Sequence, residues 1–442
     1  YSILVFIGLI TLIFSLFAFK DAMYHSSYMT LIPIIGMSLI IWFAHSSQPV
    51  TKLLSTKLFV GIGLISYSLY LWHYPIFSFS RIANFTEGDI FKKILLALII
   101  LFLAFITYVY IEKPARNKRL KFKSLMICIF CSLVIVTFSN TLVIKNDGFR
   151  LRLPKILSEN FYERPETLLK NIQGENCHDN INGCLFNTSS KKKVYIIGDS
   201  HMASIMYDLK NKLLIKDYQF ITSVFSQCIF FPEFNKVTKR NNQIDINCND
   251  KYFKRLEEKL KYEKDAIIIF GGRWPVYFNK NYFDNKEGGV EDVEWESEFI
   301  PTGKYSNIKK SFKENVTKIS ENNKIIIVYP IPEVGIDVPR AIYNKWLKGK
   351  FKENYLSEKI STSYLVYKKR NSSSFDFLNS FDNSNIYKVF PHKLFCNKNE
   401  DNRCITHDDN HKFYCDNNHP SIKGAEMINN LIINKIELIE NE

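Results

Sequence analysis

The chain has 442 residues, too many for one ordinary globular domain, and its 58 Lys and Arg against 44 Asp and Glu give a formal net charge of +14. The basic residues form no stripe with interleaved aromatic residues, so nucleic acid is not an expected partner. Apolar runs are concentrated in residues 1–143, whereas the rest of the chain is rich in Lys, Asn, Asp and Glu. The composition therefore predicts two unlike regions.

Five apolar runs in the first region predict membrane-spanning helices. Most of them approach the roughly 20 residues that cross about 30 Å of hydrocarbon. The second and fifth runs are shorter, so a buried helix or an interfacial segment is an alternative for each. Because the chain begins without Met or a charged leader, we expect it to be the later portion of a longer membrane protein. The runs cover residues 1–19, 29–44, 58–79, 94–111 and 125–138.

A basic loop between the fourth and fifth runs predicts the orientation of the chain in the bilayer. Loops rich in Lys and Arg stay in the cytoplasm. The fifth run then carries everything after about Thr141 to the opposite side of the membrane. The basic residues of this loop are Lys113, Arg116, Lys118, Arg119, Lys121 and Lys123.

The nine cysteines divide by location. Cys128 and Cys131 lie within the fifth apolar run, where small buried thiols are expected. Seven lie beyond it, where no zinc-type CxxC pair occurs and no metal is expected. Their spacing suggests local disulfides, and Cys415 has no partner in this scheme. Disulfides agree with a second region that is exported to an oxidising compartment. The candidate pairs are Cys177 with Cys184, Cys228 with Cys248, and Cys396 with Cys404.

A polar lead-in over residues 144–190, broken by two prolines and a glycine, predicts a linker. Short apolar runs then alternate with segments of helical periodicity, which is typical of a parallel sheet covered by helices on both faces. We therefore predict an α/β domain over residues 191–442. The predicted strands are 193–198, 265–272 and 323–330, and the clearest helices are 252–265 and 305–322.

The first predicted strand ends in Gly-Asp-Ser-His at residues 198–201 and passes directly into a helical pattern. Free backbone N–H groups at a helix start can stabilise a negative charge beside a serine oxygen. Ser200 is therefore a candidate nucleophile, with a helix N-cap as its alternative. Residues 271–274 and 329–333 also follow strands, so the three segments share the sheet edge where ligands bind.

A second motif near the C-terminus, "YCDNNHPSIKGAE", separates Asp416 and His419 by three residues. A turn of this length can direct both side chains to one point. A serine nucleophile needs a base to take its proton and a carboxylate to orient that base. An isolated pair of this kind is also common in surface turns, but its combination with the Gly-Asp-Ser-His turn is much more specific.

Together these motifs resemble the SGNH (GDSL-like) superfamily of esterases and acyltransferases. The stretches "GLISYSLYLWHYPIF" and "YIEKPARNK" are similar to the last helices of the acyltransferase family 3 membrane proteins, some of which carry an SGNH domain after an extra span. The resemblance implies a three-layer SGNH domain in the periplasm of a bacterium. It also implies that the multi-pass region lies in the inner membrane and lacks its first helices, including the family's acyl-loading histidine.

Carried over to this sequence, the resemblance makes Ser200 the nucleophile, His419 the general base and Asp416 its orienting acid. Asp199 would hold the turn, and the backbone N–H of Ser200 would contribute to the oxyanion hole. His201 is a further site candidate, with a solvent-facing helix residue as its alternative. The family's usual Asn block is missing, and the corresponding position reads "FGGRW", which makes Gly272, Arg273 and Trp274 the remaining oxyanion candidates.

Three residues are candidates in the membrane region. His73 lies in a helix rich in Tyr and Trp, where an interfacial aromatic belt is the alternative explanation. Glu112 and Arg116 belong to the second family stretch and could equally be a topology anchor.

We therefore expect an O-acyltransferase, most plausibly an O-acetyltransferase, with no bound cofactor. The family implies acetyl-CoA or another acyl-CoA as cytoplasmic donor, and a surface glycan such as lipopolysaccharide O-antigen, its lipid-linked precursor or peptidoglycan as acceptor. A membrane-tethered esterase would use the same triad with water, and a non-catalytic glycan-binding or transport module is the rival of another class.

Overall fold

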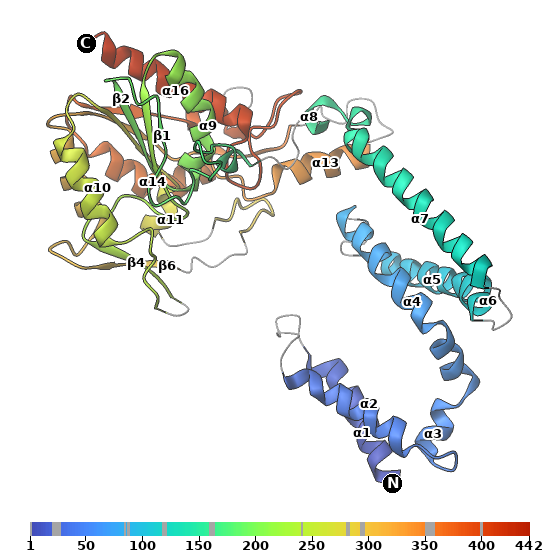
Figure 1. The fold of residues 1–442 in the computed structure, drawn as a ribbon. Helices are drawn as coiled ribbons and strands as arrows, with labels where there is room; N and C mark the ends of the chain where they lie inside the picture. The colour runs from blue at the N-terminus through green and yellow to red at the C-terminus, as the bar shows by residue number, and fades with distance from the viewer. Residues whose placement is uncertain are drawn as a thin grey trace. The chain divides into compact units, whose positions relative to one another are not determined.

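The computed structural model divides the chain into two compact units, Tyr1–Asn146 and Asp147–Glu442. Figure 1 labels helices and strands of both units. The structure describes residues 2–19, 28–83, 85, 89–116, 122–158, 164–239, 242–279, 283–291, 297–349, 359–397 and 401–442.

The described residues of the first unit form helices joined by short connections, with no strand among them. α1 packs against α2, and α4 packs against α5, which continues through a π-helical turn into α6. The elements are α1 (Ser2–Ala18), η1 (Tyr28–Thr30), α2 (Leu31–Phe43), α3 (Pro49–Leu54), α4 (Lys57–Ile82), α5 (Ile90–Thr107), η2 (Tyr108–Glu112), α6 (Lys113–Ala115) and α7 (Phe122–Lys145).

By length and composition, two of the described helices could cross a membrane, Ile90–Ala115 and Phe122–Lys145, and they contain the fourth and fifth of the five predicted runs. The first and second runs form shorter apolar helices, and the third lies in α4, where serines and His73 interrupt the apolar residues. The fifth run is not a short segment, because α7 extends beyond it at both ends. Cys128 and Cys131 are exposed on α7 instead of buried, since no residue of this helix is buried. Lys118, Arg119 and Lys121 lie outside the described residues.

A six-stranded sheet forms the centre of the second unit, in the order β1-β3-β2-β5-β7-β9. Its five longer strands are parallel, but the short edge strand β1 runs antiparallel to β3, so the sheet is mixed rather than purely parallel. The three predicted strands are β2, β5 and β7. The bounds are β1 (Leu185–Phe186), β2 (Lys193–Gly198), β3 (Gln219–Val224), β5 (Ile267–Gly271), β7 (Lys324–Val328) and β9 (Ile386–Val389).

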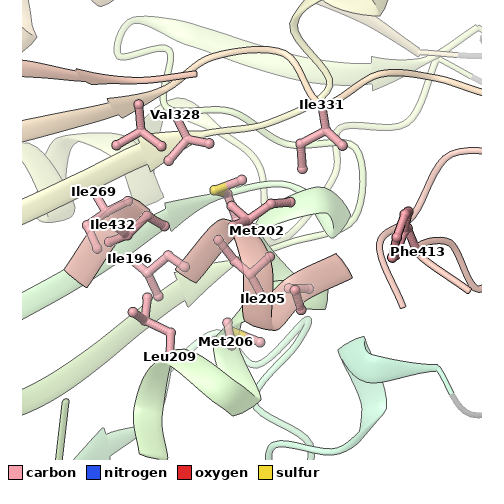
Figure 2. Close-up of a cluster of buried hydrophobic side chains, with 14 of the residues drawn as sticks. Ile196, Met202, Ile205, Met206, Leu209, Ile269, Val328, Ile331, Phe413 and Ile432 are labelled. Atoms are coloured by element: carbon pink, nitrogen blue, oxygen red, sulfur yellow. The ribbon is translucent and has the colours of Figure 1, made fainter. Parts of the chain in front are cut away.

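Both faces of this sheet are buried, because alternate residues of its central strands enter two different cores. In β2, Val194 and Ile196 pack with α9 (Ser200–Ile215) and α16 (Ile422–Glu440). Figure 2 shows this first core around Ile196 and Met202. Tyr195 and Ile197 enter the second core, which includes residues of α10 (Asp250–Tyr262) and α12 (Ile308–Ile319). Burial on both faces explains the continuous apolar runs in the sequence.

The remaining elements are further helices and two small antiparallel sheets, which pair β4 with β6 and β8 with β10. They are η3 (Asp147–Arg152), α8 (Lys155–Ser158), η4 (Pro165–Thr167), β4 (Phe234–Thr238), α11 (Trp274–Asn279), β6 (Ser297–Pro301), α13 (Val338–Gly349), β8 (Ser361–Ser363), α14 (Tyr364–Asn379), α15 (His392–Phe395) and β10 (Arg403–Ile405).

The predicted linker differs from the structure, because several of its described residues pack in the core of the α/β domain. Ile156, Leu157 and Leu169 are buried in the same core as α9 and α16. The lead-in also contributes β1 to the sheet. All three candidate disulfides are formed, and the first of them, Cys177–Cys184, lies in this segment, while Cys415 stays a free thiol.

Candidate functional site

The turn between β2 and α9 presents Ser200 at the carboxyl edge of the sheet. Gly198 ends the strand, and a Cβ there would lie 2.2 Å from the carbonyl oxygen of Gly271, so only glycine fits between the two strands. Asp199 caps the helix and Ser200 is its first residue. In the described part of the chain, no protein group accepts a hydrogen bond from the backbone N–H of Ser200 or Gly272.

The three predicted triad residues lie in one hydrogen-bonded chain. The Nε2 atom of His419 is 2.8 Å from the Oγ atom of Ser200, and its Nδ1 atom is 2.7 Å from Oδ2 of Asp416. Asp416 also accepts hydrogen bonds at Oδ1 from the backbone N–H groups of Asn418 and His419, at 2.8 and 2.7 Å. This arrangement can take the proton of the serine and stabilise the imidazolium that forms.

Electrostatics favour the charged Asp416–His419 pair. Burial opposes ionisation of Asp416, but the His419 ring and two backbone N–H donors outweigh it and hold the pKa of the Asp416 carboxyl well below its usual range. Burial likewise opposes protonation of His419, yet Asp416 raises the pKa of His419 above the ordinary value of 6.5. Glu166 raises this pKa further, and the positive charge of Arg273 opposes the rise.

Asp199 organises the turn as expected. Its Oδ1 atom accepts the backbone N–H of His201 at 2.9 Å, and Oδ2 accepts the backbone N–H of Arg273 at 2.7 Å and the hydroxyl of Tyr277 at 2.8 Å. The carboxylate therefore joins the ends of β2 and β5. Because the N–H groups of His201 and Arg273 are engaged with Asp199, they do not serve as oxyanion donors in this arrangement.

The side chain of Arg273 is held away from an oxyanion role by a buried ion network. Its Nε atom donates to Glu333 at 2.7 Å, and its terminal nitrogens donate to both carboxylate oxygens of Glu291 at 2.8 and 2.6 Å. Glu333 is only 3% exposed and also accepts from Arg370 at 3.0 Å. The sequence placed Glu333 at a strand end, but it gave no signal for Glu291 or Arg370 as partners.

The side chain of Trp274 does not supply an oxyanion donor either. Its side chain is fully buried, and its indole N–H donates to the carbonyl oxygen of Val328 at 2.9 Å. Among the described residues, the backbone N–H groups of Ser200 and Gly272, at the ends of β2 and β5, have no protein acceptor and remain oxyanion candidates.

Two residues near the triad were missed or misjudged from the sequence. His201 is fully buried, so the solvent-facing alternative is wrong, and its ring lies edge-on to that of His419 with centroids 5.2 Å apart. Glu166, from the predicted linker, is 6% exposed, and its Oε2 atom is buried with no hydrogen-bond partner in the described part of the chain. No motif signalled Glu166, because only the folding of the lead-in brings it near His419.

In the first unit the structure joins two of the three candidates. Glu112 is buried, forms an ion pair with Arg116, and accepts a hydrogen bond from the hydroxyl of Ser68 at 2.8 Å. His73 forms a contact within its own helix, where its Nδ1 atom lies 2.6 Å from the carbonyl oxygen of Tyr70.

Comparisons with known proteins place the chain in a family. A model of the family described as "SGNH domain (fused to AT3 domains)" matches residues 171–434, more than half of the chain. The O-acetyltransferase OatA of Staphylococcus aureus (strain NCTC 8325 / PS 47) is 42% identical over 79 residues, which are 17% of this chain and 13% of the relative. The peptidoglycan O-acetyltransferase OatA of Listeria monocytogenes is 31% identical over 87 residues, 20% of this chain and 14% of the relative. The matched part thus spans about one seventh of each relative's length.

Among solved structures, the periplasmic domain of the lipopolysaccharide acetyltransferase of Salmonella ser. Paratyphi A is similar to this chain, with 18% identity and a TM-score of 0.40. The superposed part covers 63% of this chain and 95% of the solved chain. The match to the family model includes Ser200, Asp416 and His419. The chain belongs to the family of SGNH domains that are fused to AT3 domains.

Proposed function

We propose that this protein is a membrane-bound O-acyltransferase, with acetyl as its acyl group, which transfers acyl groups to a hydroxyl of a cell-surface glycan through an acyl-serine intermediate. The hydrogen-bonded chain from Ser200 through His419 to Asp416 carries this proposal. The family and the O-acetyltransferase names of the two matched relatives support the choice of reaction.

In the first half-reaction, the Oγ atom of Ser200 attacks the acyl carbonyl carbon while Nε2 of His419 takes its proton. The oxyanion that forms would be stabilised by the backbone N–H groups of Ser200 and Gly272. The bond between the acyl group and its carrier then breaks, and the leaving atom takes the proton from His419. The acyl group is left as an ester on Ser200.

In the second half-reaction, His419 takes the proton of an acceptor hydroxyl, which attacks the acyl-serine carbonyl. The bond to Ser200 breaks, and its oxygen recovers the proton from His419. Water in place of the acceptor would give hydrolysis, so transfer depends on excluding water once the acyl-serine has formed.

The donor and the acceptor follow from the same proposal. A cytoplasmic acyl-CoA, with acetyl-CoA first, would load acyl groups into the membrane region, and the apolar helices Ile90–Ala115 and Phe122–Lys145 are suited to a bilayer. The second unit would then lie in the periplasm of a bacterium, where its three disulfides are stable. The relative from Listeria monocytogenes is named a peptidoglycan O-acetyltransferase, which favours peptidoglycan as the acceptor, with lipopolysaccharide as the alternative.

The test is the variant Ser200→Ala in the full-length protein, expressed in a strain that lacks the native gene. Glycan acetylation should be lost while the protein still accumulates in the membrane fraction. Ser372→Ala is the matched control, because Ser372 is an exposed helical serine whose hydroxyl bonds a carbonyl of its own helix, as serines in helices often do. Wild-type acetylation in the Ser200→Ala strain would disprove serine catalysis.

A further inference from the structure

Two hydrogen bonds join the helix that carries the nucleophile to the turn that carries the base. One is the bond between Ser200 and His419. The other lies directly beside it, where the Nε2 atom of His201 is 2.9 Å from Oδ1 of Asn418. Both partners of this second bond are buried, at 0% and 4% exposure, whereas Ser200 and His419 are partly exposed. A buried polar pair of this kind holds its geometry against competition from water.

The hydrogen bonds around Asn418 define the protonation state of the His201 ring. The Nδ2 atom of Asn418 donates to Oδ1 of Asn417 at 2.6 Å, which leaves its Oδ1 atom as the acceptor for His201. His201 therefore carries its proton on Nε2. Its Nδ1 atom is buried without a hydrogen-bond partner among the described residues, so a second proton there would have no acceptor.

Asn418 lies between Asp416 and His419 in the chain, and its backbone is part of the site. Its N–H donates to Oδ1 of Asp416, the same oxygen that accepts the N–H of His419. A displacement of Asn418 would therefore move the carboxylate that orients the base. The turn is also anchored from the other side, because the N–H groups of Val334 and Gly335 both donate to the carbonyl oxygen of Asn417 at 2.9 Å.

We propose that His201 is a positioning residue, which acts through Asn418 to hold the Asp416–His419 pair in register with Ser200. This inference rests on the proposed serine catalysis and adds a residue to it. The anchor through Asn417 fixes the turn to the loop after β7, but it does not fix the turn relative to α9. The His201–Asn418 bond supplies that link, because His201 follows Ser200 directly on the same helix.

The charges around His201 keep it suited to this role. Burial lowers the pKa of His201 to about 4, Asp199 opposes the shift, and the positive charges of His419 and Arg273 add to it. A neutral His201 adds no positive charge beside His419 when that ring takes up the proton of the serine. The hydrogen bond to Asn418 is thus present throughout the pH range in which His419 works as a base.

The experiment compares variants of the full-length chain in detergent. His201→Leu removes the hydrogen bond and keeps an apolar side chain in the space, His201→Gln offers a new amide donor, and Asn418→Ala removes the acceptor. His392→Leu is the matched control, because His392 is also a buried histidine with an unpartnered Nδ1 atom and a pKa lowered by burial to about 4, but it packs among aromatic rings such as Tyr367.

Four quantities are measured: kcat and KM for hydrolysis of 4-nitrophenyl acetate, the rate at which a fluorophosphonate labels Ser200, and the pH at the midpoint of the acid limb of the kcat–pH profile. We expect His201→Leu to lower kcat and the labelling rate roughly 10- to 100-fold with little change in KM, because small displacements of reacting groups have effects of this size. His201→Gln should restore most of the loss. His392→Leu should lower the melting temperature without changing kcat.

Two measurements separate a positioning role of His201 from a merely structural one: the acid limb of the kcat–pH profile, and the activity of a double variant. When Asn418 is displaced, Asp416 holds His419 less well, so the pKa of His419 falls and the acid limb moves to lower pH. Asp416 and Glu166 support that pKa and Arg273 opposes it, while all three are left unchanged in the variants. The double variant His201→Leu/Asn418→Ala should be no slower than either single variant, because the two residues act as one unit.

The outcomes also distinguish this inference from the proposed function. If the wild-type protein neither labels with the fluorophosphonate nor hydrolyses the ester, serine catalysis itself is wrong. If the wild type does both and His201→Leu matches it in kcat and acid limb, the positioning role is wrong. A loss in His201→Leu that equals the loss in His392→Leu would likewise overturn the inference.

Discussion

Asp199 is a clear example of a single side chain that arranges groups from several segments. Its carboxylate accepts hydrogen bonds from the backbone at His201, from the backbone at Arg273 and from the hydroxyl of Tyr277. A carboxylate accepts several hydrogen bonds and donates none, which suits it to bind converging donors at a helix start. The neighbouring N–H groups of Ser200 and Gly272 are left for a ligand.

Gly272 provides a test of this arrangement at the residue scale. A Cβ at this position would lie 2.8 Å from Oδ2 of Asp199 and 2.7 Å from Cδ1 of Ile229. Ile229 can move its side-chain end, but Asp199 is fixed by its three donors, so Gly272→Ala should displace the carboxylate. We expect the rate of ester hydrolysis to fall by roughly 10-fold or more, because small displacements of reacting groups cause losses of this size.

The control for this change is Gly63→Ala, since a Cβ at Gly63 meets nothing within 4 Å. Both variants are assayed as purified full-length proteins with 4-nitrophenyl acetate. Unchanged hydrolysis in Gly272→Ala would mean that the position of Asp199 does not matter to the nucleophile.

The pH dependence of activity follows from His419. A general base must be neutral to accept a proton, and the pKa of His419 is raised above 6.5, chiefly by Asp416, against the opposing effect of burial. Activity should therefore fall as the pH drops through this raised pKa, and the midpoint of the acid limb should lie above 6.5. In Asp416→Asn the midpoint should move to lower pH. A wild-type midpoint well below 6.5 would contradict the assignment of His419 as the base.

At the scale of elements, the segment before the Asp416–His419 turn is short and held by a disulfide. Cys396 follows α15 and Cys404 lies within β10, which pairs with β8. The chain then reaches the turn through Thr406 and Phe413, which are joined by a backbone hydrogen bond of 2.9 Å. The disulfide therefore restrains the start of the segment that delivers the base to the nucleophile.

The disulfides should differ in how much they stabilise the fold. Cys396 and Cys404 are separated by 8 residues, and Cys228 and Cys248 by 20. In the chain-entropy model a longer closed loop gives more stabilisation, about 2–3 kcal/mol for the shorter loop and slightly above 3 kcal/mol for the longer one. Thermal unfolding of Cys→Ser pairs measures this. A larger stability loss in Cys396→Ser/Cys404→Ser would show that the shorter bridge acts through native contacts instead.

At the scale of the whole molecule, the two units have separate interiors. The triad, the sheet and both of its cores are contained in Asp147–Glu442. The first unit exposes many large apolar side chains over its helices, as expected for segments that face lipid. This division suits a relay in which one unit moves acyl groups and the other transfers them.

The isolated fragment 147–442 should therefore fold and hydrolyse an activated acetate ester slowly, but it should not use acetyl-CoA. Its site and core are complete without the helical unit, and in the proposed periplasmic location it would need no pocket for a charged cytoplasmic thioester. Hydrolysis should vanish in Ser200→Ala and His419→Ala fragments. Efficient Ser200-dependent transfer from acetyl-CoA by the fragment would show that the units do not form a relay.

The boundary of this fragment matters. A fragment that begins at residue 191, after the predicted linker, lacks Ile156, Leu157, Leu169, β1 and the Cys177–Cys184 disulfide. Each buried aliphatic side chain contributes about 1.5–3 kcal/mol, so the shorter fragment should be far less stable. Equal melting temperatures for fragments 147–442 and 191–442 would contradict the packing of the lead-in.

The sequence by itself determined the features that depend on neighbouring residues. Continuous apolar runs predicted β2, β5 and β7, because strands buried on both faces need no polar alternation. The Gly-Asp-Ser-His turn and the Asp416–His419 spacing identified residues that the structure joins by hydrogen bonds. The short spacing between cysteines also predicted the three disulfides that form. Each of these signals is contained within a few residues or in one recognisable pair of motifs.

Only the tertiary structure decided the contacts that surround these motifs. His201 and Asn418 are 217 residues apart in the sequence, and Arg273 and Glu333 are 60 residues apart. Neither pair could therefore be predicted from periodicity or local spacing. The antiparallel edge strand β1 and the buried Glu166 depend on how the lead-in folds back onto the domain. Such contacts are set by the order of strands in the sheet, which brings distant strand ends to one edge, and that order is a property of the packed molecule.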